Sequence, residues 1–132
     1  MTPPKLITLK DYLMGRTKKY PISDDVMTNA LVTVSRANQL LQAFGKHRDV
    51  NSGYRPYAIN ILIPNAKPKS KHITCCAIDF DDDDGTLDFF CLNNTDLLAE
   101  IGLWLEHPMS TPGWSHLQTL PPPSGRRVFL VN

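Results

Sequence analysis

Residues 70–80 read SKHITCCAIDF, and this stretch decides how the middle of the chain folds. Apolar side chains occur at alternate positions within it, a period that is typical of a β-strand and predicts a central strand over residues 72–80. His72 and Asp79 are seven positions apart, and an odd separation directs two side chains to opposite faces of a regular strand. A bulge or bend is therefore required if this imidazole and this carboxylate are to act together.

A long amphipathic helix is predicted before this strand. Ser23, Asp24 and Asp25 are residue types that favour a helix N-terminus, and Gly45 is the type that most often follows the last turn. Between these two signals, apolar residues recur at spacings of three and four, namely at Val26, Ala30, Val34, Ala37, Leu41 and Phe44. The pattern predicts a helix from about residue 24 to residue 44.

The remaining predicted elements are shorter. The capping residues Asn93 to Asp96 favour a short helix that ends near Gly102. Residues 103–106 and 114–120 are expected to be two strands of a hairpin joined by a proline-rich loop. Three further strands are expected at residues 49–55, 87–92 and 127–131. The fold class is therefore α+β, with a small antiparallel sheet packed against a long N-terminal helix and a short second helix.

Length and composition indicate one globular domain. The chain has 132 residues, of which 42% are hydrophobic, and this suffices for one modest core. Residues 1–21 are predicted to form an N-terminal arm with one short helix. Residues 22–132 are predicted to form the single domain.

Charge and cysteine content restrict the classes of partner. A formal net charge of +1 provides no strong field for nucleic acid or for an anionic membrane surface. No apolar run approaches the ~20 residues that span a bilayer, and the N-terminus lacks the apolar stretch of a secretory signal. Three cysteines form no disulfide framework, so free thiols and folding in a cytoplasm are expected.

Two histidines and one aspartate form a candidate metal site. His116 lies in the predicted strand after the loop, so it can face His72 and Asp79 from a neighbouring strand. Two neutral imidazoles with one carboxylate and an open coordination position are a known catalytic zinc arrangement. Spacing alone leaves the alternative open that these histidines are surface or hydrogen-bonded core residues.

Three motifs resemble the D-alanyl-D-alanine carboxypeptidase family. They read SGYRP at 52–56, SKHITCCAID at 70–79 and WSHL at 114–117, and they resemble, in the same order, the family's SGYR motif, its SxHxxGxAxD motif and its strand ending in histidine. The family includes zinc D,D-peptidases, D-Ala-D-Ala dipeptidases and phage endolysins, and it has a Hedgehog-type fold. Residues 9–16 and 124–129 also look like the phage-encoded branch.

The resemblance implies a function for the domain at residues 22–132. It implies a zinc-dependent carboxypeptidase or endopeptidase that hydrolyses D-amino-acid-containing stem peptides of peptidoglycan. The protein would be made in the host cytoplasm and would act at the cell wall, or it would form part of a phage particle with other virion proteins as partners.

The resemblance also implies roles for single residues. The metal ligands would be His72, Asp79 and His116, with Zn²⁺ as the cofactor. Arg55 would bind and polarise the substrate carbonyl. Tyr54 and Ser70 would lie on the substrate side of the site, and Ser70 is also expected to support the bend before His72 through a side-chain hydrogen bond.

The chain departs from the family pattern at two places. Cys75 occupies the position of a motif glycine, and a thiolate there, or at Cys76, is an alternative zinc ligand for a closed structural site. Gly113 and Trp114 stand where the family often has its general base, and neither accepts a proton. Glu106 is then the best substitute and His107 a weaker one, with the alternative that Glu106 is an exposed charge of the hairpin. The alternative is a catalytically inactive virion structural or wall-binding protein that retains the fold.

An acidic run at residues 79–85 invites comparison with a calcium-binding hand. Counted from Asp79, the sixth position is Asp84 and the twelfth is Phe90, where the hand requires glycine and glutamate. Residues 81–84 are therefore predicted to be a solvated turn.

Overall fold

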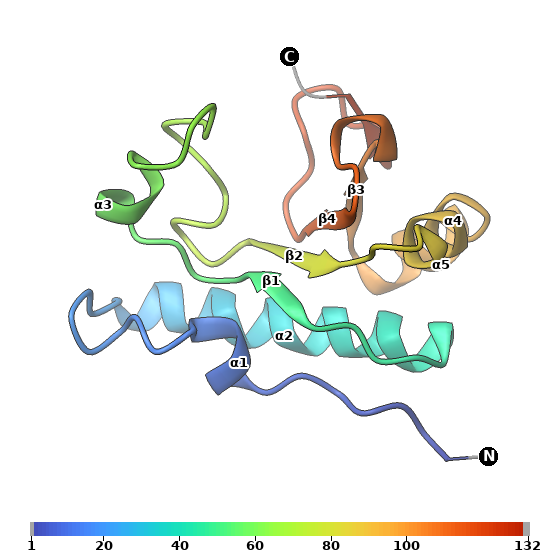
Figure 1. The fold of residues 1–132 in the computed structure, drawn as a ribbon, viewed down its shortest axis with the longest axis horizontal. Helices are drawn as coiled ribbons and strands as arrows, with labels where there is room; N and C mark the ends of the chain where they lie inside the picture. The colour runs from blue at the N-terminus through green and yellow to red at the C-terminus, as the bar shows by residue number, and fades with distance from the viewer. Residues whose placement is uncertain (1, 131–132) are drawn as a thin grey trace.

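The computed structural model describes residues 2–130 (Figure 1). The first six elements along the chain are α1 (Leu9–Leu13), α2 (Asp24–Phe44), β1 (Val50–Ser52), α3 (Tyr57–Asn60), β2 (Ala77–Asp81) and α4 (Thr86–Leu92). Five more follow: α5 (Thr95–Ile101), β3 (Trp104–Glu106), the 3₁₀ turn η1 (Pro108–Ser110), β4 (Trp114–Gln118) and β5 (Val128–Phe129). The fold is α+β, as predicted.

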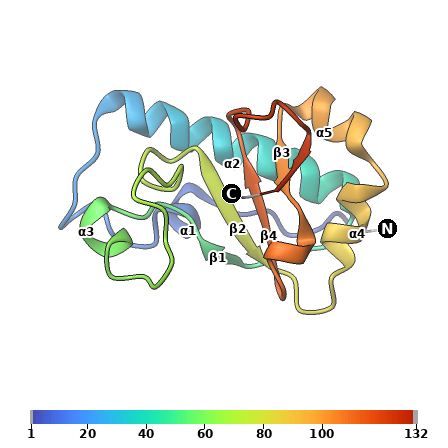
Figure 2. The same ribbon diagram turned by 90° about the horizontal axis from the view of Figure 1, so that it is seen from above.

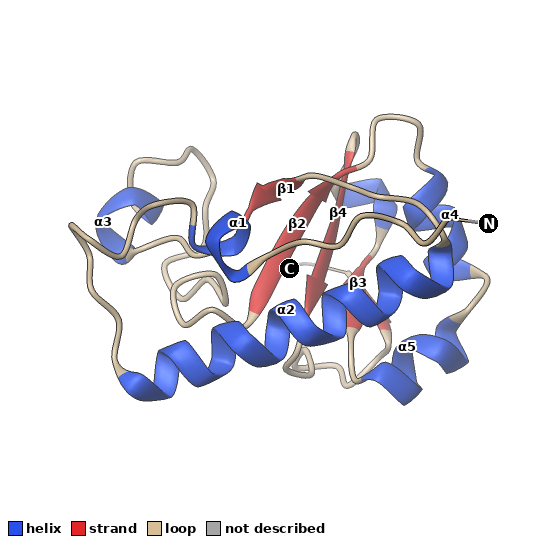
Figure 3. Ribbon diagram, turned by 90° about the horizontal axis from the view of Figure 1, so that it is seen from below, coloured by secondary structure: helices blue, strands red, loops and turns tan. Residues whose placement is uncertain are grey.

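The five strands form one open sheet in the order β1-β2-β4-β3-β5. All neighbours are antiparallel except β3 and β5, which run parallel, so the sheet is mostly antiparallel, as predicted, with one parallel pair at its edge. Helix α2 covers one face of the sheet, lying behind the strands in Figure 2 and in front of them in Figure 3. Among residues 2–130, no long helix covers the opposite face.

Helix α2 confirms the prediction for residues 24–44. The Ser23 hydroxyl accepts a hydrogen bond from the backbone N–H of Val26, and Gly45 closes the helix in the left-handed conformation with φ of 84°. The face toward the sheet is buried and carries Ala30, Thr33, Ala37, Leu40 and Leu41. These residues belong to one core cluster with inward-facing strand residues, namely Ile78, Phe80, Leu105 and Leu117.

The N-terminal segment is part of the same core. Helix α1 begins with a capping box in which Thr8 and Asp11 bond reciprocally. Tyr12 is fully buried and donates a hydrogen bond of 2.7 Å to the carbonyl of Ala77, which ties α1 to the first residue of β2. The predicted short helix is confirmed. Met1 of the predicted arm lies outside the described residues.

The strand predicted over residues 72–80 starts later than expected. Residues 72–76 form turns, and β2 begins only at Ala77. Cys75 has φ of 61°, a left-handed conformation that ends strand geometry, and its carbonyl accepts a hydrogen bond from the Thr33 hydroxyl of α2. The bend that the spacing of His72 and Asp79 required is therefore present as a turn before the strand.

Residues 87–92 form a helix, so the predicted strand there is wrong. Asp82 explains the difference, because its two carboxylate oxygens accept hydrogen bonds of 3.0 Å from the backbone N–H groups of Leu87 and Asp88 and so start α4. Asp81, Asp83 and Asp84 are exposed, as predicted for a solvated turn, whereas Asp82 is 2% exposed. The composition of residues 87–92 favours a strand, but the hydrogen bonds to Asp82 at the start of the segment stabilise a helix instead.

The other short elements agree with the sequence in kind and differ in length. The helix predicted near residue 95 is confirmed as α5, and the hairpin is confirmed as β3 paired with β4. β1 is shorter than the predicted residues 49–55, and β4 ends at Gln118. The last strand is reduced to β5, while Val131 lies outside the described residues. None of the described helices is long and apolar enough to cross a membrane.

Candidate metal centre

The candidate metal centre lies on the sheet face opposite α2. Residue partners across the strands place Ser52 beside Asp79 and Asp79 beside His116. Directly paired residues of neighbouring strands point to the same face, and the alternate residues Ile78 and Leu117 point into the core under α2. His72 joins from the turn before β2. Sheet register therefore brings together groups from three separate parts of the chain.

The ligand atoms of His72, Asp79 and His116 lie within 4.8 Å of one another. His116 Nδ1 is 2.7 Å from Asp79 Oδ1, and His72 Nε2 is 3.2 Å from Asp79 Oδ2. His72 is 3% exposed and Asp79 is 7% exposed, so the donors converge in a largely buried position. This group could hold a metal ion, as the sequence predicted.

The outer nitrogen of each imidazole is held by a fixed acceptor. His72 Nδ1 lies 2.9 Å from the carbonyl oxygen of Gly53, which can only accept, so this nitrogen carries the hydrogen. His116 Nε2 lies 3.0 Å from Gln118 Oε1, and Gln118 is oriented because its amide nitrogen donates to the carbonyl of Leu120 at 2.8 Å. Such outer hydrogen bonds are typical around metal-binding histidines.

These tautomers direct the inner lone pairs toward a single carboxylate. In their neutral forms His72 Nε2 and His116 Nδ1 would both present lone pairs to Asp79, and lone pairs facing a carboxylate repel unless a proton or a cation lies between them. The arrangement therefore requires positive charge at its centre. A divalent cation supplies that charge for all three donors at once.

The pKa directions of the three groups agree with this requirement. Burial alone would lower the pKa of His116, but the hydrogen bond to Asp79 and the charge of Asp79 outweigh it and raise the pKa. Burial dominates for His72 and lowers its pKa, which keeps Nε2 available as a donor to a cation. Burial would raise the pKa of Asp79, yet the two histidines hold it well below its ordinary value.

Arg55 lies at the edge of the same group. Its Nη2 is 3.7 Å from Asp79 Oδ2 and donates a hydrogen bond of 3.0 Å to the Ser52 hydroxyl. Its Nη1 donates to Asn60 Oδ1 at 3.2 Å, and Asn60 is itself fixed by a bond of 2.8 Å to the carbonyl of Lys67. Burial lowers the pKa of Arg55 and the charge of Asp79 raises it. The guanidinium is thus held in place beside the candidate metal ligands.

Glu106 is placed on the same face by register. β3 and β4 pair Leu105 with Leu117, so the next step along both strands brings Glu106 beside His116. Burial raises the pKa of Glu106, the nearby charge of His116 lowers it, and the charge of Asp79 raises it. The electrostatic coupling to both groups agrees with the expected position of this carboxylate next to the site.

The other residues predicted for the site lie around it in different roles. The Ser70 hydroxyl accepts a hydrogen bond of 3.2 Å from the His72 backbone N–H, which supports the bend as predicted. Tyr54 is 4% exposed, and its hydroxyl donates to the carbonyl of Tyr20, so it stabilises the fold and offers no free group to a ligand.

Neither thiol belongs to the group of metal donors. The group formed by the described residues contains only the two imidazoles and one carboxylate. Burial raises the pKa of the Cys75 thiol to about 12, which keeps it protonated and poorly suited to bind a cation. The alternative of a closed site completed by Cys75 or Cys76 therefore has no support in the geometry.

Apart from Ser70, the residues that hold the site in place were not predicted from the sequence. Gln118 was detectable, because it stands two positions after His116 in a predicted strand and so shares its face. Gly53 is explained by close packing, since a Cβ at this position would lie 2.0 Å from the carbonyl oxygen of Tyr12. No local pattern indicates that contact.

Comparison with known proteins leaves the family open. No protein-family model matches the chain, and no curated protein or solved structure matches it either.

Proposed function

We propose that this protein is a zinc-dependent peptidase that hydrolyses D-amino-acid-containing stem peptides of bacterial peptidoglycan and is encoded by a phage or prophage. The observation that carries the proposal is the convergence of His72, Asp79 and His116, with Arg55 beside them and Glu106 on the same sheet face. The motif resemblance supplies the substrate class.

The donor set fits zinc. Two imidazole nitrogens and one carboxylate oxygen are ligands that zinc commonly has in catalytic sites, where a fourth position stays open for a reactant. Both outer nitrogens are hydrogen-bonded, at Gly53 and Gln118, which orients the rings for coordination. Zinc, when bound there, acts as a Lewis acid that polarises a carbonyl and makes water more acidic.

The chain's own residues supply the remaining steps of hydrolysis. Arg55 donates a hydrogen bond to the substrate carbonyl oxygen and stabilises the negative charge that develops on it. Glu106 accepts a proton from the attacking water, whose oxygen forms a bond to the carbonyl carbon. Glu106 then returns the proton to the amide nitrogen as the peptide bond breaks, so the products are a free acid and a free amine.

Burial tunes Glu106 for this exchange. A carboxylate whose pKa is raised is a better base than an exposed one and also a competent acid in the second step. Arg55 is fixed in advance by Ser52 and Asn60, which lowers the cost of ordering it around a substrate.

The test measures release of D-alanine and of peptide fragments from purified peptidoglycan by the zinc-loaded protein. Wild type should release product, whereas His116→Ala and Glu106→Gln should lose activity by about 100-fold or more. Glu100→Gln, an exposed change of the same chemistry, should retain full activity. A Glu106→Gln variant that cleaves normally would show that Glu106 is not the base.

A second candidate function is that of a virion structural or wall-binding protein without turnover. The absence of a base at Gly113 and Trp114 favours it. Under this alternative, wild type binds zinc and matches His116→Ala in releasing no product. Retention on insoluble peptidoglycan in that case would identify a wall-binding role.

A further inference from the structure

A second polar site lies at the end of the sheet, away from the candidate metal centre. It is an open pocket of about 360 Å³ between the start of α4 and the loop that contains η1. Its lining combines acidic groups, Asp82, Asp83, Asp84 and Asp88, with apolar ones that include Phe89 and Leu92. Neither lysine nor arginine lines it.

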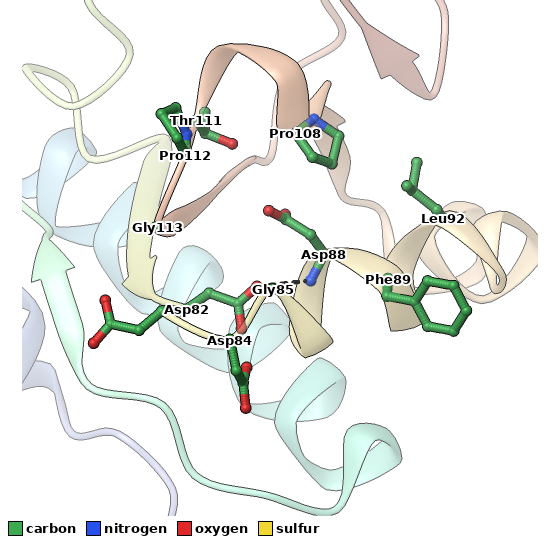
Figure 4. Close-up of a pocket in the computed structure, with 11 residues that line it drawn as sticks. Asp82, Asp84, Gly85, Asp88, Phe89, Leu92, Pro108, Thr111, Pro112 and Gly113 are labelled. Carbon is green, nitrogen blue, oxygen red and sulfur yellow. Dashed lines mark hydrogen bonds between the residues drawn. The ribbon is translucent and has the colours of Figure 1, made fainter.

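Two buried polar atoms in this pocket have no hydrogen-bond partner among the described residues. They are Asp88 Oδ1 and Thr111 Oγ1, on side chains that are 6% and 1% exposed. Figure 4 shows the Asp88 carboxylate and the Thr111 hydroxyl pointing into the pocket from opposite sides. A buried polar oxygen without a partner in the protein is costly to a fold, so a partner from outside the chain, water or a ligand, is expected at both oxygens.

The charges around the pocket are unbalanced. Arg48 is shared between Asp82, at 3.2 Å, and Asp84, at 3.1 Å. Asp83 and Asp88 form no ion pair with any described residue. Burial also raises the pKa of Asp88 to about 6. The missing donor is therefore expected to carry positive charge.

The arrangement of donor atoms in the pocket favours an organic cation over a metal ion. Among the described residues, the only three carboxylate, imidazole or thiolate donors close enough to share one ion are those of the metal centre. The carboxylates of the pocket are therefore not close enough together for three of them to share one calcium or magnesium ion. Its volume suits a small organic group, and its apolar wall suits an alkyl stem.

We infer that this pocket binds a primary ammonium group on a short alkyl chain, as on a lysine side chain. The ammonium donates to Asp88 Oδ1 and Thr111 Oγ1, and its stem packs on Phe89 and Leu92. An ammonium has three donors, which is enough for both orphaned oxygens and one water. The inference does not depend on the metal centre.

The test is an NMR titration of the full chain with N-acetyl-lysine amide as the probe. We expect saturable shifts at residues 82–88 and 111–113, with a dissociation constant of about 1 mM for a ligand of this size. N-acetyl-norleucine amide lacks the ammonium and should cause no such shifts. Equal binding of both probes, or no binding of the lysine probe, would overturn the inference.

Matched variants locate the contact. Asp88→Asn should weaken lysine-probe binding at least about tenfold, and Thr111→Val should weaken it less but measurably. Asp96→Asn, at an exposed aspartate on the neighbouring helix, should bind as wild type does. Unchanged binding in both pocket variants would refute the site, and so would calcium chloride shifting these residues when the lysine probe does not.

Discussion

Replacement of Asp88 by asparagine should stabilise this protein at neutral pH. Burial raises the pKa of this carboxyl, a contact with Ser115 lowers it and the charge of Asp82 raises it, and together these effects move the pKa from an ordinary 3.8 to about 6. At about 1.4 kcal/mol for each pH unit, the elevation corresponds to a loss of up to roughly 3 kcal/mol when the buried group ionises. Asparagine keeps the shape of the side chain and removes the charge.

The sign of the pH dependence follows from the raised pKa. A carboxyl with a raised pKa contributes stability that is fully present below pH 3.8 and is lost as the pH rises through about 6. Wild type and Asp88→Asn should therefore have similar free energies of unfolding near pH 4. At pH 7 the variant should be more stable, by about 1 to 3 kcal/mol.

Urea unfolding at several pH values between 4 and 8 measures this difference directly. The other carboxyl groups titrate in both proteins and cancel in the comparison, so only Asp88 contributes to the change. A variant that is less stable than wild type at pH 7 would refute the reasoning, because Asp88 would then be making favourable contacts. A difference that does not vary with pH would refute it too.

Three further predictions concern the metal centre and its support. Gly53→Ala should lower the free energy of unfolding by more than about 3 kcal/mol in urea, because its Cβ would meet the Tyr12 carbonyl; a smaller loss would mean that α1 moves aside easily. Gln118→Ala should weaken zinc binding about 10- to 100-fold in chelator competition, whereas exposed Gln42→Ala should not; equal losses would contradict the orienting role. The zinc affinity of wild type should fall as the pH is lowered, because His116, whose pKa is raised, takes up a proton. An affinity that does not vary with pH would exclude His116 as a ligand.

The sequence predicted best those features that depend on local periodicity and capping. The α2 helix is recognisable because its apolar period, its Ser23 cap and its closing Gly45 all indicate the same boundaries. The hairpin was also predictable, since its two strands are neighbours along the chain. Register in that hairpin then places Glu106 near His116, as the spacing suggested.

Two features could not be read from the sequence: one depends on a distant contact, and the other depends on a capping carboxylate that lies before the segment itself. Alternating apolar residues at 72–76 resemble a strand, but Cys75 takes a left-handed conformation and bonds to Thr33, which is 42 positions away. Residues 87–92 look like a strand by composition, and the carboxylate of Asp82 starts a helix there instead. In both cases one side chain outside the element decides its structure.

The candidate site divides in the same way. Its three donors were predictable from residue type and motif resemblance together, whereas their spacing alone left other roles open. The residues that orient them are not, since the acceptor for His72 is a backbone carbonyl at Gly53 and carries no side-chain signal. Asp88 and Thr111 likewise come to line one pocket only through folding.

Isothermal titration of the metal-free protein with zinc tests the central claim most directly. Wild type should bind one zinc ion per chain, and His72→Ala and His116→Ala should each lose that binding. His47→Ala should keep it, because His47 lies apart from the triad and bonds to Lys5 and Asp49. A wild-type protein that binds no zinc, or triad variants that bind it as well as His47→Ala does, would contradict the claim.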